Sequence, residues 1–212
     1  PRVRSNILII KRFLGILYSY LSKIYNESKP RYYKTRSETD ALMIELLEYS
    51  NSVDFVGISH RRLSKYIQDF LDQNQSVKLR EVNIFFSNTR DGESWEKDYL
   101  ENVQSSIKQI GYVFSLPENI NKLKSDVTIK FYMMRHHSTF GGCNINDTIF
   151  FINHYLPGEN IDTRWEYTLK IDSLNPTNEA IFLSERYKEA FDKIKQKSDL
   201  LGSYTPGIWD LS

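Results

Sequence analysis

Apolar residues recur at three- and four-residue spacing in several long stretches of the chain, which is the pattern of amphipathic helices. The clearest case is residues 178–196, where Ile181, Phe182, Tyr187, Phe191 and Ile194 are periodic. On this pattern we expect helices over residues 7–25, 39–49, 61–73, 94–110, 118–124 and 178–196.

Shorter runs that are apolar, or that alternate apolar with polar, indicate strands. We expect these over residues 53–59, 77–86, 127–135, 148–155 and 164–171. The first two flank a helix and form a βαβ unit, whose crossover should be right-handed. The last two form an antiparallel pair joined through Pro157–Gly158. Residues 200–212 are expected to dock through their aromatic side chains rather than to continue a helix.

The order of these elements predicts an α/β fold, a mixed sheet flanked by helices. Residues 1–36 are expected to form an N-terminal helical extension, and residues 37–212 the α/β domain.

Residues 136–147 interrupt the strand pattern with histidines, glycines, asparagines, an aspartate and the single cysteine. We expect a loop here, at the end of a strand. Open α/β folds usually bind ligands or carry out chemistry at such strand ends. The stretch therefore predicts a site more clearly than it predicts a reaction.

Charged and polar side chains near these strand ends are the candidate site residues. If the strands are parallel, His60 lies at the same edge of the sheet as His137. We expect ligand contacts from Arg61, Lys130, Arg135, Asn144, Asp147 and His154. The positively charged side chains in this set suit a ligand that carries a phosphate or a carboxylate. The alternatives stay open: Arg61 as a solvated residue of a first helical turn, the histidines as structural groups, and the asparagines and Asp147 as turn formers.

The amino-acid composition limits the classes of function that this chain can have. The formal net charge is +1, so net charge does not support nucleic-acid binding, although a local basic patch would allow it. One cysteine excludes an internal disulfide and a cysteine-rich zinc module, and we expect a cytoplasmic protein without a membrane span. The possible metal ligands lack a compact ligand spacing, so we predict neither a metal nor a cofactor. These ligand types are His60, His137, Cys143, Asp147 and His154.

Two phrases of the sequence carry a family resemblance. The first is VDFVGIS, a helix beginning RRLSKYIQDFL, and VKLREVNIFF. The second is VTIKFYMMRHH…NINDTIFFINHYLPG followed by RYKEAFDKI. Together they resemble a phospholipase-D-like domain over residues 38–197. Enzymes of that family carry H-x-K-x4-D-x6-G-S, in which a histidine attacks phosphorus, a lysine stabilises the phosphoryl oxygens and a second histidine is the general acid.

This chain departs from that motif in either possible register. Starting at His137, Thr139 and Asn144 replace the lysine and the aspartate. Starting from Asp147, Phe140 and Gly142 stand at the histidine and lysine positions. Threonine offers a neutral donor where the chemistry needs an ammonium.

The resemblance therefore implies a non-catalytic or altered domain. It would bind a nucleotide-like or phosphate ligand, or a protein partner, as a homodimer in a bacterial regulatory or defence protein. The alternative is a phosphodiesterase, nuclease or nucleotide-processing hydrolase that uses His137 with His60.

Overall fold

The computed structural model describes residues 30–33, 36–58, 60, 62–74, 77–87, 95–123, 126–136, 138, 140–154, 168–174, 177–206 and 208–211. The helix expected over residues 7–25 and the Pro157–Gly158 connection lie outside these residues, as does most of the expected extension 1–36. The proposed division of the chain at residue 36 thus stays a prediction.

The described residues form one nine-stranded mixed sheet with the strand order β1-β7-β6-β5-β2-β3-β4-β8-β9. The strands are β1 (Arg31–Tyr33), β2 (Ser52–Gly57), β3 (Glu81–Phe86), β4 (Thr128–Met134), β5 (Phe140–Ile145), β6 (Ile149–His154), β7 (Thr168–Asp172), β8 (Ser198–Thr205) and β9 (Ile208–Leu211). The helices are α2 (Arg36–Glu48), α3 (Leu63–Gln73), α4 (Trp95–Ser115), α5 (Pro117–Ile120) and α6 (Asn178–Gln196).

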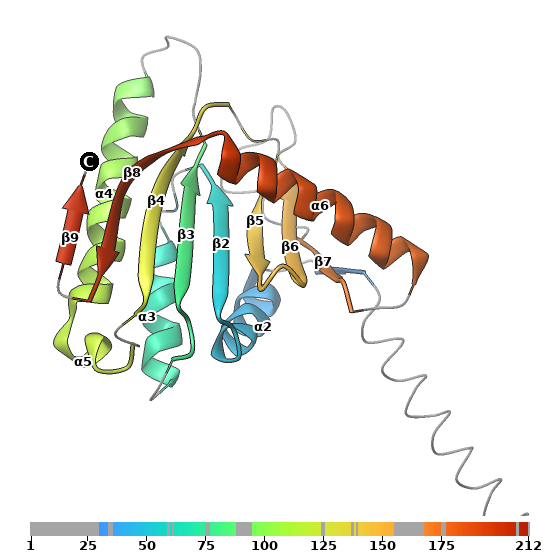
Figure 1. The fold of residues 1–212 in the computed structure, drawn as a ribbon, viewed down its shortest axis with the longest axis horizontal. Coiled ribbons are helices and arrows are strands. Elements are labelled where there is room, and N and C mark those ends of the chain that lie inside the picture. Colours follow the sequence, from blue (N-terminus) through green and yellow to red (C-terminus); the bar gives the residue numbers. More distant parts are fainter. Residues whose placement is uncertain are drawn as a thin grey trace, which may run out of the picture.

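Helices cover the two faces of the sheet unequally. Helices α2, α3 and α4 lie against one face, and α6 crosses the other near the carboxyl ends of the parallel strands (Figure 1). Alternate residues of a strand point to opposite faces, so Val53 and Phe55 pack toward α2 and α3, whereas Val56 packs with Phe191 of α6. In front of the amino-terminal parts of β3 and β4 and the carboxyl-terminal part of β8 there is no described helix on the α6 side (Figure 1).

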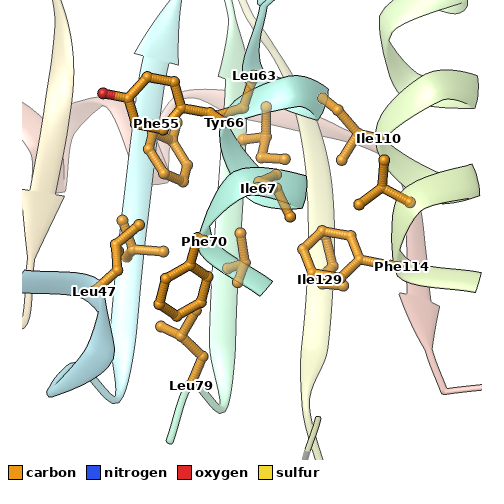
Figure 2. Close-up of a cluster of buried hydrophobic side chains, with 14 of the residues drawn as sticks. Leu47, Phe55, Leu63, Tyr66, Ile67, Phe70, Leu79, Ile110, Phe114 and Ile129 are labelled. Carbon is orange, nitrogen blue, oxygen red and sulfur yellow. The ribbon is translucent and has the colours of Figure 1, made fainter. Parts of the chain in front are cut away.

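The larger core lies between the sheet and helices α2 to α4 (Figure 2). Phe70 of α3 and Phe114 of α4 are almost fully enclosed. The apolar stripe predicted for residues 61–73 is the buried face of α3, which contributes Leu63, Tyr66, Ile67, Phe70 and Leu71. This packing holds the parallel strands β2, β3 and β4 in register.

Most of the elements expected from the pattern are present. The βαβ unit is confirmed, because β2 and β3 are parallel and flank α3. The antiparallel pairing of β6 with β7 is also confirmed. The tail differs from expectation, since it forms two strands, β8 and β9. One of its aromatic side chains, Tyr204, does dock by packing on Phe114.

The expectation of a loop over residues 136–147 is wrong for its second half. Residues Phe140–Ile145 form β5, which lies between β2 and β6 and is antiparallel to both. The connection to β6 is a tight turn at Asn146 and Asp147, whose φ angles are 53° and 56°. Two consecutive positive φ angles are the backbone of a type I′ hairpin turn, which favours asparagine and aspartate.

Gly142 allows β5 and β6 to approach each other closely. A Cβ atom at this position would lie 2.0 Å from the backbone oxygen of Phe151. We expect Gly142→Ala to lower the free energy of unfolding by about 2–3 kcal/mol, because the strands must separate to admit the methyl group. Urea unfolding measures this loss. The matched control is Gly57→Ala, whose Cβ would meet only the His60 side chain, at 2.8 Å, and should cost less. Equal stability of Gly142→Ala and the unsubstituted protein would contradict this strand pairing.

Candidate ligand-binding site

Four polar residues form a row across neighbouring strands on the α6 side of the sheet. Asp54 of β2 pairs with Asn83 of β3 and with Asn144 of β5, and Asn83 pairs with Lys130 of β4. We call these four residues the polar row. Strands lie about 4.8 Å apart, so successive members are near neighbours.

Asp54 is the centre of the row. Its side chain is 4% exposed, and Lys195 from the last turn of α6 lies 2.8 Å from Oδ2. The Asn83 amide donates to Oδ1 over 2.9 Å, and the Asn144 amide donates to Oδ2 over 3.0 Å. A buried carboxylate is costly unless it is paired and hydrogen-bonded, and here three groups from three elements satisfy it.

Further charges surround this centre. The Asn83 amide also donates to Glu81 over 3.0 Å, and the Asn144 amide donates to Asp147 over 2.6 Å. Each of these two outer carboxylates has a lysine near it. The ammonium of Lys130 lies 4.0 Å from the carboxylate of Glu81. Lys188 of α6 likewise lies 4.0 Å from Asp147. The side chains of both lysines are more than a third exposed.

The pKa values of the central pair shift for different reasons. Burial raises the pKa of Asp54, and the hydrogen bonds from Lys195 and Asn83 only partly offset it. Burial lowers the pKa of Lys195, but the hydrogen bond to Asp54 and the charges of Asp54, Asp147 and Glu81 together outweigh this and raise it overall. Burial and the charges of Glu81 and Asp54 also raise the pKa of Tyr132, which places its hydroxyl within the field of this cluster. Asp54 is more deeply buried than Lys195. The ion pair therefore stabilises the ionised form of Asp54 less, on balance, than it stabilises the ionised form of Lys195.

Two buried acceptors in the row lack a partner. Among the described residues, Oδ1 of Asn83 and Oδ1 of Asn144 are buried without a hydrogen-bond partner. The two residues are 3% and 2% exposed. Each amide nitrogen donates to two carboxylates, which fixes the orientation of the amide. An unsatisfied buried acceptor is unusual and calls for a donor.

Three of the residues expected at the site lie in or beside this cluster. Lys130 and Asn144 belong to the polar row, and Asp147 is bound to Asn144. Arg135 lies elsewhere: it is exposed and makes a 2.7 Å ion pair with Asp199 of β8, which raises the pKa of its guanidinium. His154 ends β6 opposite Phe140, and its side chain lies outside the described residues. Arg61 and His137 also lie outside them.

His60 is half-buried just beyond the carboxyl end of β2. Its Nε2 atom lies 3.0 Å from the backbone oxygen of Phe85, and its ring packs edge-on against Phe86. Gly57 leaves the space that the ring occupies. Burial lowers the pKa of His60 to about 4, so the ring is neutral at pH 7 and is not a protonated general acid.

Cys143 is buried in β5, and burial raises the pKa of its thiol well above the usual value. It is therefore a packing residue rather than a nucleophile. The described residues contain no group of three or more His, Cys, Asp or Glu side chains that suits a metal ion.

The sequence reasoning missed the centre of the site, Asp54 and Asn83, and the lysine that closes it, Lys195. One signal was available. Asp54 stands inside the apolar run VDFVG, and an aspartate in a fully buried strand must have a partner. Nothing local in the sequence identifies that partner as Lys195.

The sequence matches no protein-family model and no curated protein. Solved structures of similar topology include Nuc from Salmonella typhimurium, a phospholipase D family member. It is 7% identical with a TM-score of 0.41, covering 81% of this chain and 97% of that one. NucT from Helicobacter pylori is 17% identical with a TM-score of 0.40, covering 80% of this chain and 97% of that one. The mixed α/β sheet with flanking helices is confirmed. In the described part of the chain, no helix is long and apolar enough to cross a membrane.

Proposed function

We propose that this chain is a non-catalytic or altered phospholipase-D-like domain that binds a nucleotide-like, phosphate-bearing ligand at the polar row. The observation that carries the proposal is the combination of lysine ammonium groups with unsatisfied buried acceptors in one cluster. Such a cluster offers charge to a phosphate and hydrogen bonds to a base. The domain would act as a homodimer in a regulatory or defence protein, as the sequence resemblance implies.

The phosphate contacts are assigned to Lys130 and Lys188. Each ammonium lies 4.0 Å from a carboxylate and is partly exposed, with side-chain exposures of 37% and 52%. Ion pairs of this kind contribute little to stability, so a phosphate can replace the carboxylate at small cost. Lys195 differs, because its 2.8 Å bond to buried Asp54 holds it to the fold.

The described residues favour binding over hydrolysis. Asn144, which stands at the aspartate position of one motif register, is held by two carboxylates. His60 is neutral and hydrogen-bonded to the backbone. A hydrolase that uses His137 with His60 would first have to release that ring.

A ligand-induced rise in melting temperature tests the proposal, because a ligand that binds only the native state stabilises it. We expect 5′-nucleotides to raise the melting temperature, and the combined variant Lys130→Ala/Lys188→Ala to lose most of this shift. The control is Lys193→Ala, which lies on the same helix and, among the described residues, pairs with Glu189. Native mass spectrometry of the same preparation should show a dimer that carries a small co-purified mass.

The alternative function makes the opposite prediction. A hydrolase would cleave bis-p-nitrophenyl phosphate and lose turnover in His137→Ala while its melting temperature stayed unchanged. If the chain cleaves this substrate, loses the activity in His137→Ala and is not stabilised by nucleotides, its function is catalysis rather than ligand binding.

A further inference from the structure

We infer that the ligand is a nucleotide whose base carries an exocyclic amino group, and that this group donates a hydrogen bond to Oδ1 of Asn83. The inference rests on the proposed function and deepens it by naming the ligand class. The juxtaposition that carries it is a buried, unpartnered acceptor on the α6 side of the sheet, on the strand next to Lys130 and on the same face as Tyr132.

The acceptor at Asn83 has a fixed direction. Its amide nitrogen donates to Asp54 over 2.9 Å and to Glu81 over 3.0 Å. Turning the amide over would set its oxygen against two carboxylates, so Oδ1 has to face away from them. The residue is 3% exposed, and Oδ1 has no partner among the described residues. The group that completes the site must therefore be a donor.

The chemistry of the surroundings selects the kind of donor. A phosphate at neutral pH offers acceptors, so it cannot satisfy Oδ1. A metal cation would stand beside the ammonium of Lys195, which already occupies the Asp54 carboxylate. A neutral donor avoids both conflicts, and in a nucleotide the exocyclic amino group of the base is such a donor. Glu81, whose side chain is 49% exposed, provides a second acceptor next to Asn83.

Neighbouring side chains suit the rest of such a ligand. Tyr132 is half-buried, and its ring stacks on Phe85 at a centroid separation of 4.8 Å. Tyr132 is two residues beyond Lys130 on β4, so both side chains lie on the same face. An aromatic surface beside an ammonium matches a base next to a phosphate.

Lys195 closes the Asp54 side of this site, and its 2.8 Å bond to the buried carboxylate holds it there. On the other side of Asn83 stand Lys130 and Glu81, whose side chains are 37% and 49% exposed and whose charged atoms are 4.0 Å apart. An exposed pair of this kind separates at small cost, so the base reaches Asn83 from the side of β4.

The test compares two nucleotides that differ only in the amino group. Adenosine 5′-monophosphate carries it, and purine riboside 5′-monophosphate has hydrogen in its place. By isothermal titration with the full chain, we expect the first to bind about 10-fold to 100-fold more tightly, because loss of the donor leaves a buried acceptor unsatisfied. Uridine 5′-monophosphate, which lacks an exocyclic amine, should bind as weakly as the purine riboside.

Two leucine variants locate the contact. Asn83→Leu and Asn144→Leu each remove one amide donor to Asp54, but only Asn83→Leu removes the proposed acceptor. The preference for adenosine monophosphate should disappear in Asn83→Leu and persist in Asn144→Leu. If Asn83→Leu fails to fold, the comparison of nucleotides on the unsubstituted chain still decides the matter.

Each outcome has one meaning. Equal binding of adenosine and purine riboside monophosphates overturns this inference and leaves the proposed function standing. A preference that survives in Asn83→Leu also overturns it. If neither nucleotide nor inorganic phosphate binds, the proposed function and this inference fail together.

Discussion

Asp54→Ala is expected to lower the free energy of unfolding by about 2–3 kcal/mol, because it removes the anion that accepts hydrogen bonds from two buried amides and a partly exposed ammonium. Lys195, Asn83 and Asn144 all direct donors at this carboxylate. Without the Asp54 carboxylate, each amide still donates to one other carboxylate. The ammonium of Lys195 loses the carboxylate that it binds on the sheet. Urea unfolding followed by circular dichroism measures the loss. Lys195→Ala should cost at least as much at pH 7, because it leaves the Asp54 carboxylate, which is 4% exposed, without its cation.

The matched control for this substitution is Asp199→Ala. The Arg135–Asp199 pair has nearly the same separation, 2.7 Å, but the side chains are 62% and 59% exposed. Exposed pairs contribute little, so Asp199→Ala should leave the unfolding midpoint almost unchanged. Similar losses for the two aspartates would show that burial does not set the strength of the Asp54 pair, and would contradict this account.

Acid should destabilise the protein through His60. The side chain is half-buried, its ring is hydrogen-bonded to the backbone oxygen of Phe85, and burial lowers its pKa to about 4 from 6.5. A histidine with a lowered pKa in the folded state stabilises the fold above pH 6.5, and this contribution is lost as the pH falls from 6.5 toward 4. The shift corresponds to about 3 kcal/mol over that interval. Unfolding in urea at several pH values between 7.5 and 4 measures it.

His60→Asn provides the comparison for the acid effect. Asparagine tolerates the positive φ of 52° at this position and does not titrate in this range. The difference between the two proteins isolates His60 from Asp54, whose raised pKa acts in the opposite direction because protonation relieves its burial. The same pH dependence in both proteins would rule out His60 as its source.

The sequence by itself determined the elements whose patterns are local. The periodic apolar residues of α3 and α6 specify amphipathic helices wherever they lie, since one face must be buried. The apolar runs of β2 and β3 specify buried strands on either side of α3. These signals were enough to predict the α/β class, the βαβ unit, the antiparallel β6–β7 pair and three of the residues beside the candidate site.

Only the tertiary structure decided how distant residues meet. Residues 140–145 are rich in glycine and polar side chains, and they become a strand because β2 and β6 supply hydrogen-bonding partners on both sides. Asp54 and Lys195 are far apart in the chain, and they meet because the last turn of α6 reaches the carboxyl end of β2. Arg135 turns to Asp199 because β8 pairs with β4. Strand order and helix placement depend on packing between elements, so a single sequence predicts the elements well and their contacts poorly.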